Sequence, residues 1–165
     1  MSLKPEIETV LMRAGWDPGR DRSTEITAWL GQLSEAFPIV DSALDVLGRF
    51  GGLDVELSGP GEEWSRQSFR IDPALALGED DRFADFSAML GVRLFPLGEV
   101  GNQAFLSLGE DGKVYALMLD LWWVGDSIDE AVERLVRGLS GRLLIDEFAY
   151  RDWIEHHEHK NTQTP

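Results

Sequence analysis

RLFPLGEVGNQAFLSLGEDGKVYALMLDLWWVGD, residues 93–126, is the stretch that decides the fold. Two apolar runs, residues 104–108 and 113–119, flank a GEDG turn at 109–112, and an Asp-Gly pair between such runs is typical of a β-hairpin. Neither run alternates cleanly between apolar and polar residues. Both strands are therefore expected in the middle of a sheet whose two faces are covered.

The hairpin is followed by a clear helix signal. Ser127 is placed as a helix N-cap, and Glu130 stands three residues on, which is the capping-box pattern. Apolar side chains then recur at the i, i+3, i+4, i+7 spacing of one helical face. They are Ile128, Ala131, Val132, Leu135, Val136 and Leu139. A hairpin that leads into a covering helix is the predicted centre of the architecture, and it carries no visible chemistry.

Three short helices are predicted ahead of any strand. The first spans residues 6–14, the second begins at the N-cap Ser23, and the third begins at the N-cap Asp41. Each is followed by a glycine or a proline, which ends a helix. Residues 53–57 then alternate between apolar and charged side chains and predict a half-exposed strand, which residues 68–71 resume.

The rest of the chain adds a helix, a strand and a last helix. Helix signals start at residue 79 and stop at Gly91, and residues 94–97 predict a short strand. Pro96 within that strand argues for an edge position. Residues 144–159 predict the last helix, with one apolar face made of Ile145, Phe148, Ala149 and Trp153. The expected class is α+β: N-terminal helices, a mostly antiparallel central sheet of about five or six strands, and covering helices toward the C-terminus.

Composition limits the partners. Lys and Arg number 15 against 30 Asp and Glu, so the net charge is −15, which repels nucleic acid and anionic membranes and attracts basic partners. The simpler interpretation is that the carboxylates only keep the protein in solution. Cysteine is absent, which fits a reducing cytoplasm. No signal-peptide pattern and no apolar run of membrane-spanning length occur, so a cytoplasmic protein is expected.

No nucleophilic active site is indicated. Cysteine is absent, the three histidines all lie within residues 156–159, and no Gly-x-Ser-x-Gly elbow occurs. A Ser-His or Cys-His enzyme is therefore not predicted, and no cofactor is expected. A glycosidase that uses two carboxylates stays open as an alternative, but nothing singles out a pair.

Two groups of residues are weighed as metal sites, and no metal site is predicted. Glu79, Asp80 and Asp81 offer the oxygen ligands that hard cations prefer, but acidic residues at a helix start are ordinary dipole chemistry. The same three residues fit an acidic docking face better. His156 and His159 would share a helical face with Asp152 or Glu155, but histidine near a helix C-terminus also has a simple electrostatic reason.

Three tryptophans are candidates for contact with a partner. Of Trp122 and Trp123, one indole is expected in the core and the other as an interface anchor, since tryptophan is enriched at binding hot spots; core positions for both are the alternative. Trp64 follows the Gly-Pro-Gly turn at 59–61 in a segment expected to be exposed. The turn lacks the pattern of a phosphate loop, so a tight turn is favoured.

Taken in order, the turn and cap motifs form a series. They are AGWDPGR at 14–20, FGGL at 50–53, GPG at 59–61, IDP at 71–73, ALGEDDRF at 76–83, LFPLGE at 94–99, EDGKVY at 110–115 and GDSIDEAVERL at 125–135. This ordered series over residues 14–138 resembles the SUKH superfamily, and most closely its third family of bacterial immunity proteins. The resemblance implies residues 1–138 as an immunity domain and residues 139–165 as a C-terminal helical extension of the same domain.

The resemblance also implies a function. Such an α+β protein is the antidote in a bacterial polymorphic toxin system, and it binds a cognate toxin domain, often a nuclease or deaminase, without performing chemistry. The family offers no catalytic motif to carry over, so no catalytic residue is assigned. Its shared motifs look like folding devices, and the residues that contact the toxin are expected largely outside them.

The leading hypothesis is therefore a non-catalytic immunity protein with a carboxylate-rich surface that binds a basic toxin. The candidate contacts are Glu62, Glu63, Trp64, Glu79, Asp80, Asp81 and Trp123. The second hypothesis is an intracellular scaffold or regulatory binding module without a toxin partner. A divalent-metal hydrolase that uses the acidic residues at 79–81 is a distant third.

Overall fold

The computed structural model describes the backbone of residues 3–101 and 103–162 and the side chains up to His157. Within these residues the helices are α1 (Pro5–Arg13), α2 (Ser23–Leu33), α3 (Ala43–Phe50), the 3₁₀ helix η1 (Pro73–Ala76), α4 (Asp80–Leu90), α5 (Ile128–Arg137) and α6 (Glu147–Thr162). The strands are β1 (Asp54–Val55), β2 (Phe69–Arg70), β3 (Leu94–Val100), β4 (Ala104–Gly109), β5 (Val114–Leu117), β6 (Leu121–Gly125) and β7 (Arg142–Ile145).

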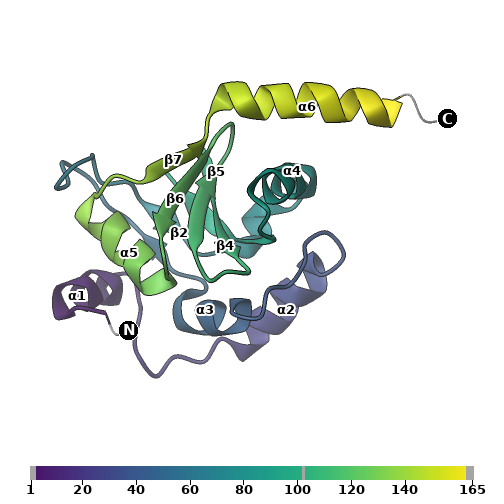
Figure 1. The fold of residues 1–165 in the computed structure, drawn as a ribbon. Coiled ribbons are helices and arrows are strands. Elements are labelled where there is room, and N and C mark those ends of the chain that lie inside the picture. The colour runs from purple at the N-terminus through teal and green to yellow at the C-terminus, as the bar shows by residue number, and fades with distance from the viewer. Residues whose placement is uncertain (1–2, 102, 163–165) are drawn as a thin grey trace.

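The seven strands form one antiparallel sheet in which the order of the strands follows the chain, β1 to β7. The predicted α+β class is confirmed. Figure 1 shows α5 and α4 on opposite sides of the sheet, α2 and α3 packed beside one another, and α6 extending away from the rest of the molecule.

The predicted hairpin is the centre of this sheet. β4 and β5 pair from Phe105 opposite Leu117 to Leu108 opposite Val114, and the side chains of these four residues are buried. Burial on both faces is the reason why neither strand alternates between apolar and polar residues. The prediction of a mid-sheet hairpin is confirmed.

Two strands were not predicted. β6 follows β5 after a short turn and carries Trp122 and Trp123, and β7 pairs with β6 after α5 has crossed the sheet. The prediction of a helix from residue 144 is therefore wrong at its start, since the helix begins at Glu147. Residues 142–145 become a strand because β6 offers them a partner about twenty residues away in the chain, which local patterns do not reveal.

The edge position predicted from Pro96 is wrong for the strand as a whole. β3 is the third of the seven strands, and Pro96 pairs with Ser107 of β4. The proline is tolerated because β2 pairs only with Glu99 and Val100, so the half of β3 that holds Pro96 has a strand on one side alone. Locally that half is an edge, which is where a residue without an N–H fits.

One of the three predicted helix caps is confirmed. The Ser127 hydroxyl accepts the Glu130 N–H (3.2 Å), while the Glu130 carboxylate accepts the N–H of Asp126 (2.8 Å), one residue earlier than a standard capping box. The other two caps are wrong. Ser23 is the first residue of α2 and donates its hydroxyl to Asp21 (2.5 Å), and α3 begins after Ser42 with no side-chain cap from Asp41.

The apolar face predicted for the last helix is wrong at Phe148. That side chain is 82% exposed, while Tyr150 is buried and stacks on Phe86 of α4 (ring centroids 4.3 Å apart). Trp153 is half-buried, and its indole N–H donates to Asp85 of α4 (3.4 Å). The face is rotated because α6 must reach α4 from a start fixed by the end of β7.

The helices cover the two faces of the sheet around a common core. Phe105 of β4 packs against Phe83 of α4 (ring centroids 6.0 Å apart). The next side chain along the strand, Leu106, points to the other face, where its partner Ala116 lines a pocket together with Leu135 of α5. In the described part of the chain no helix is long and apolar enough to cross a membrane.

Candidate functional site

The structure separates the seven predicted contact residues into two groups. Glu62, Glu63 and Trp64 lie in the loop between β1 and β2, which packs against the end of α5, and Trp123 lies in the neighbouring strand β6. The second group, residues 79–81, begins α4. We call the first loop, residues 59–66, the Trp64 loop.

The backbone of the Trp64 loop caps α5. The N–H of Glu62 donates to the carbonyl of Arg137 (2.8 Å), and the N–H groups of Glu63 and Trp64 donate to the carbonyl of Gly138 (3.0 and 2.8 Å). The last carbonyls of a helix have no partner within the helix, so a loop that offers three donors satisfies them. The Gly-Pro-Gly turn predicted at 59–61 brings these donors into place, and Pro60 forms an isolated bridge with Ser65.

The two acidic side chains of the loop add to this attachment. Glu62 accepts two hydrogen bonds from the Arg137 guanidinium, one of them 3.0 Å long, and Glu63 accepts the N–H of Ser140 (3.0 Å). The hydrogen bonds from Arg137 lower the pKa of the Glu62 carboxyl below its usual value. Both carboxylates are exposed and keep further acceptor positions for a partner.

The tryptophans lie side by side at the end of α5. Trp64 is 48% exposed and meets Trp122 edge to face (centroids 5.4 Å apart, planes at 76°). Trp123 is half-buried, and the guanidinium groups of Arg134 and Arg142 stack on its ring, 4.8 and 4.9 Å from the centroid. Neither Trp122 nor Trp123 is fully buried, and the more exposed indole is that of Trp64.

An apolar pocket of about 240 Å³ opens beside Trp64 and Trp122. Its floor is the sheet: Val100 pairs with Ala104, and Ala116 pairs with Trp122, so these side chains point to one face. The Trp64 loop, the end of α5 and Gly141 form its walls. The small alanines leave the space that a larger side chain would fill. Such a pocket suits an apolar side chain or a small apolar group.

The second acidic group lies on the other side of the turn between β5 and β6. Glu79 accepts from the Nε of Arg82 (2.8 Å), and Arg82 also donates to the carbonyl of Met118 in that turn. Asp120, in the same turn, lines the apolar pocket. Asp80 and Asp81 occupy the first turn of α4, where carboxylates favour the helix dipole. The turn at Met118–Asp120 therefore lies between the two predicted groups.

The model of the SUKH-3 immunity protein family matches residues 3–138 of the chain. The chain belongs to this family. The resemblance drawn from the ordered motifs is thereby confirmed, and the family supports the role of an immunity protein, which implies binding to a cognate toxin. Neither a curated protein nor a solved structure matches the chain. β7 and α6 lie beyond the matched residues.

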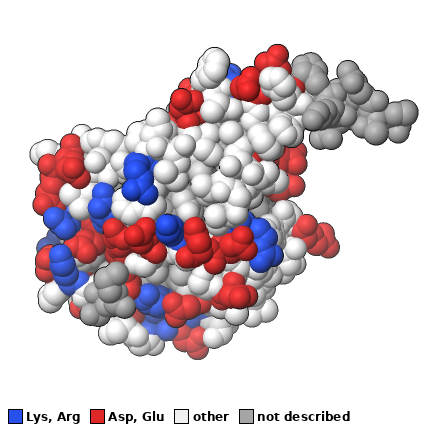
Figure 2. All heavy atoms as spheres, in the orientation of Figure 1, with Lys and Arg blue, Asp and Glu red and all other residues white. Residues whose placement is uncertain are grey.

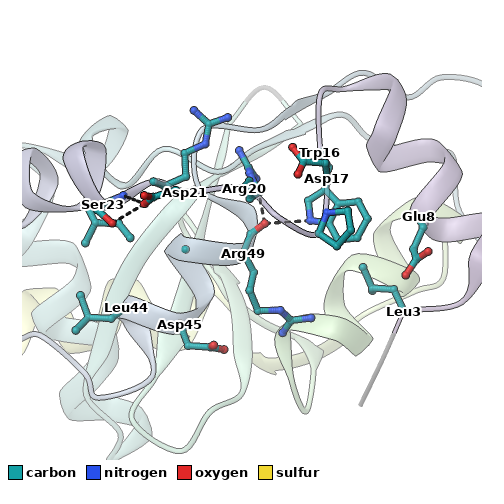
Figure 3. Close-up of a pocket in the computed structure, with 14 residues that line it drawn as sticks. Leu3, Glu8, Trp16, Asp17, Arg20, Asp21, Ser23, Leu44, Asp45 and Arg49 are labelled. Atoms are coloured by element: carbon teal, nitrogen blue, oxygen red, sulfur yellow. Dashed lines mark hydrogen bonds between the residues drawn. The ribbon is translucent and has the colours of Figure 1, made fainter.

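The residues that match the SUKH-3 family include the AGWDPGR motif at 14–20. The structural role of this motif is not evident from the sequence. Trp16 and Arg20 both donate to the carbonyl of Arg49 (3.1 and 3.0 Å), and Arg20 also donates to the carbonyl of Gly51 (2.8 Å). The motif therefore satisfies the end of α3 across a gap of about thirty residues. Figure 3 shows these groups at the wall of a larger pocket of about 730 Å³.

This larger pocket resembles a structural junction more than a ligand site. Arg49 bonds to Asp129 of α5 (2.5 Å) and so joins α3 to α5, and Asp21 bonds to Ser23. In Figure 3 the Arg49 side chain extends away from its carbonyl, on which Trp16 and Arg20 converge. Several polar groups around the pocket thus have partners within the fold, although the Nε atoms of Arg20 and Arg22 are buried without a hydrogen-bond partner among the described residues. We place the candidate site of this SUKH-3 protein at the Trp64 loop instead, where an exposed indole lies beside an apolar pocket.

Charge on the SUKH-3 protein is mixed where Figure 2 shows it. Asp and Glu side chains alternate with Lys and Arg in a band across this face, and the surface between the band and the projecting helix α6 is mostly uncharged. The described side chains include no group of three or more His, Asp or Glu arranged to hold a metal ion. His156 contacts the carbonyl of Asp152 (2.7 Å), and the side chain of His159 lies outside the described residues.

Proposed function

We propose that this protein neutralises a cognate toxin domain by covering a functional surface of the toxin, without chemistry of its own. The observation that carries the proposal is the family match over residues 3–138. Its support in the structure is the exposed indole of Trp64 beside an apolar pocket, because partly exposed aromatic anchors next to pockets are common at the centre of binding interfaces.

The proposed toxin is basic and acts on nucleic acid, as a nuclease or a deaminase. The net charge of −15 favours such a partner and speeds its approach. Glu62 and Glu63 on one side of the turn at Met118–Asp120, and residues 79–81 on the other, offer carboxylates that would pair with Arg and Lys of the toxin or occupy the positions of substrate phosphates. Trp64 and Trp123 would supply apolar contact.

The direct test is co-expression with the toxin domain encoded beside this gene, scored by survival of the host and by co-purification. Rescue together with a stable complex is the expected result. If the toxin domain kills the host and does not co-purify, the proposal is wrong, and the protein becomes a candidate for the alternative, an intracellular scaffold without a toxin partner.

The electrostatic part has its own test with two matched variants. Asp81→Lys changes the charge at an exposed position in the first turn of α4, and Glu56→Lys makes the same change at an exposed position next to β1. We expect Asp81→Lys to slow association with the toxin domain by about threefold or more at low salt and to weaken its salt dependence. Equal association rates for both variants would show that only the net charge of the protein matters, and not the position of the carboxylate.

A further inference from the structure

The last strand of the sheet is an open edge. β7 is at the end of the strand order and pairs only with β6 among the described strands. Figure 1 shows it leading into α6, which extends away from the sheet. Leu143 and Leu144 of β7 are 45% and 38% exposed, and Phe148, in the first turn of α6, is 82% exposed. Apolar side chains therefore accompany unpaired strand backbone here.

We propose that β7 is the edge to which a strand of the cognate toxin adds, which extends the sheet across the two proteins. This inference rests on the proposed function. A strand edge offers a row of backbone donors and acceptors that a partner strand satisfies, while side-chain pockets along the edge select the partner. Among the described strands, β7 combines an open side with apolar side chains next to a pocket.

The register connects this edge to the pocket. Leu143 lies opposite Trp122 on β6, so both side chains point to the same face of the sheet, and Trp122 lines the pocket with Trp64. Gly141, directly ahead of β7, also lines the pocket. A strand added to β7 at the usual spacing of about 4.8 Å would place every second side chain on this face, beside Leu143 and toward the pocket mouth.

Charge selects the occupant. Every copy of this chain carries −15, so a second copy would meet strong repulsion, whereas a basic strand would be attracted. Near the edge, Asp120 lines the pocket, and no hydrogen bond or ion pair joins its side chain to another described residue. Asp146 and Glu147 follow β7 directly. A strand with Lys or Arg beside its apolar residues fits this border.

The cations near the edge already have partners within the fold. Arg134 and Arg142 stack on Trp123, and Arg134 also donates to the carbonyl of Ser140 (2.6 Å). Arg151 pairs with Glu147 (2.7 Å). These cations keep their charge, and Glu147 is itself engaged by Arg151, so the preference for a basic strand rests on Asp120, on Asp146 and on the net charge of −15.

The position of β7 in the chain fits partner-specific contact. The family match ends at Gly138, where the Trp64 loop is attached, and β7 begins at Arg142. An antidote must bind its own toxin and reject others, so specificity contacts are best placed on segments that the shared fold does not constrain. β7 and the first turn of α6 meet this condition, while the pocket beside them is built mostly from matched residues.

The test compares two leucine variants in binding to the purified toxin domain encoded beside this gene. Leu143→Lys changes the proposed edge, and Leu44→Lys makes the same change at a leucine of α3 that is 50% exposed. We expect Leu143→Lys to raise Kd by about tenfold or more, because it removes apolar contact and adds a charge opposed to a basic strand, and Leu44→Lys to change Kd by less than about twofold.

Hydrogen exchange of the wild-type protein supplies a backbone readout that needs no variant. In the complex, amides of residues 142–145 that exchange fast in the free protein should slow by about tenfold or more, while those of β1 keep their rates. If the wild-type protein binds the toxin but neither the edge amides nor Leu143→Lys respond, the inference is wrong and the proposed function stands. If the wild-type protein does not bind at all, the proposed function itself fails. A free dimer that protects these amides and dissociates in Leu143→Lys would make a second copy the occupant and overturn the inference.

Discussion

The two edge strands of the sheet, β1 and β7, differ in length and in the side chains that they expose. β1 is only two residues long, and its exposed Asp54 pairs with Arg70 of β2 (3.7 Å). Next to it, Leu57 uses both backbone groups with the Ser68 hydroxyl (2.9 and 3.1 Å), so the chain leaves the sheet with its polar groups satisfied. β7 is four residues long and exposes two leucines.

Another strand pairs less readily with a short, charged edge strand than with a longer, apolar one. The closed edge lies inside the residues that match the family, and the open edge lies outside them. The short, charged edge thus belongs to the part of the fold that the family shares, and the longer apolar edge is built from residues beyond the match. Substitutions on each side of the sheet test this difference.

Gly98→Ala should break the sheet on the side of β1. A Cβ at Gly98 would lie 1.8 Å from the carbonyl oxygen of Arg70 and 2.9 Å from the backbone nitrogen of Asp72, and backbone cannot move aside cheaply. We expect the free energy of unfolding to fall by about 3 kcal/mol or more, the upper range for overpacking. Unfolding in urea, followed by tryptophan fluorescence, measures this.

Gly31→Ala is the matched control for that substitution. Gly31 lies inside α2, and nothing is within 4 Å of the position of an added Cβ. Alanine is the better helix former, so stability should stay the same or rise by up to about 1 kcal/mol. Equal unfolding midpoints for Gly98→Ala and the wild type would mean that β3 does not approach the end of β2 as closely as the structure shows.

Gly61→Ala should loosen the side of β7 without unfolding the protein. An added Cβ would lie 2.4 Å from the carbonyl oxygen of Trp64 and 2.6 Å from the Cα of Gly138, so the Trp64 loop must lift from α5. Because this loop is largely exposed and can shift, we expect a loss of about 2 kcal/mol and a red shift of tryptophan emission. Gly19→Ala, where the nearest atom is 3.5 Å away, should leave both unchanged.

Whether a feature of the fold could be predicted from the sequence depends on how far apart in the chain its contacting residues lie. The β4–β5 hairpin and the cap at Ser127 rest on residues a few positions apart, and both were predicted. β6 and β7 were not, because strand pairing depends on partners that local patterns do not name. The helix predicted from residue 144 shows the error: apolar residues at its start belong to β7, and the helical face moved from Phe148 to Tyr150.

The candidate site divides in the same way. Trp64 was predicted as exposed because a Gly-Pro-Gly turn precedes it. Its partner Trp122 lies almost sixty residues further on, and the hydrogen bonds between the Trp64 loop and the end of α5 span about seventy-five residues. No prediction included Leu143. Its side chain is exposed because β7 is the last strand of the sheet, and the neighbouring residues in the chain do not reveal this. The acidic residues were easy to name, but their separation around the turn between β5 and β6 needed the structure.

Ser127→Ala tests the helix that carries the Trp64 loop. The hydroxyl caps α5 through the N–H of Glu130, and its loss should cost about 1 kcal/mol of unfolding free energy. Ser42→Ala is the control, because Ser42 precedes α3 without a side-chain cap bond, and the change there should be close to zero. Equal losses in both variants would mean that the cap at Ser127 contributes little to the stability of α5.

Glu62→Gln should give the smallest effect, and a pH-dependent one. Hydrogen bonds from Arg137 hold the pKa of Glu62 below the usual value of 4.5. The ionised carboxylate therefore stabilises the folded protein above that value, and this contribution disappears as the pH falls through the lower folded-state pKa. The wild type should have a slightly higher Tm than the variant near about pH 7, and the difference should shrink near about pH 3. Because the pair is exposed, the effect is screened by salt.

Glu56→Gln is the matched control for Glu62→Gln, since it places the same substitution beside β1. Glu56 is exposed and has no hydrogen bond or ion pair with another described residue, so its Tm difference from the wild type should be close to zero at both pH values. A Tm difference for Glu62→Gln that is the same at both pH values would show that Glu62 fastens the Trp64 loop without help from its charge. In that case hydrogen bonds that do not depend on charge would hold the loop next to the open edge, and salt would not loosen the attachment.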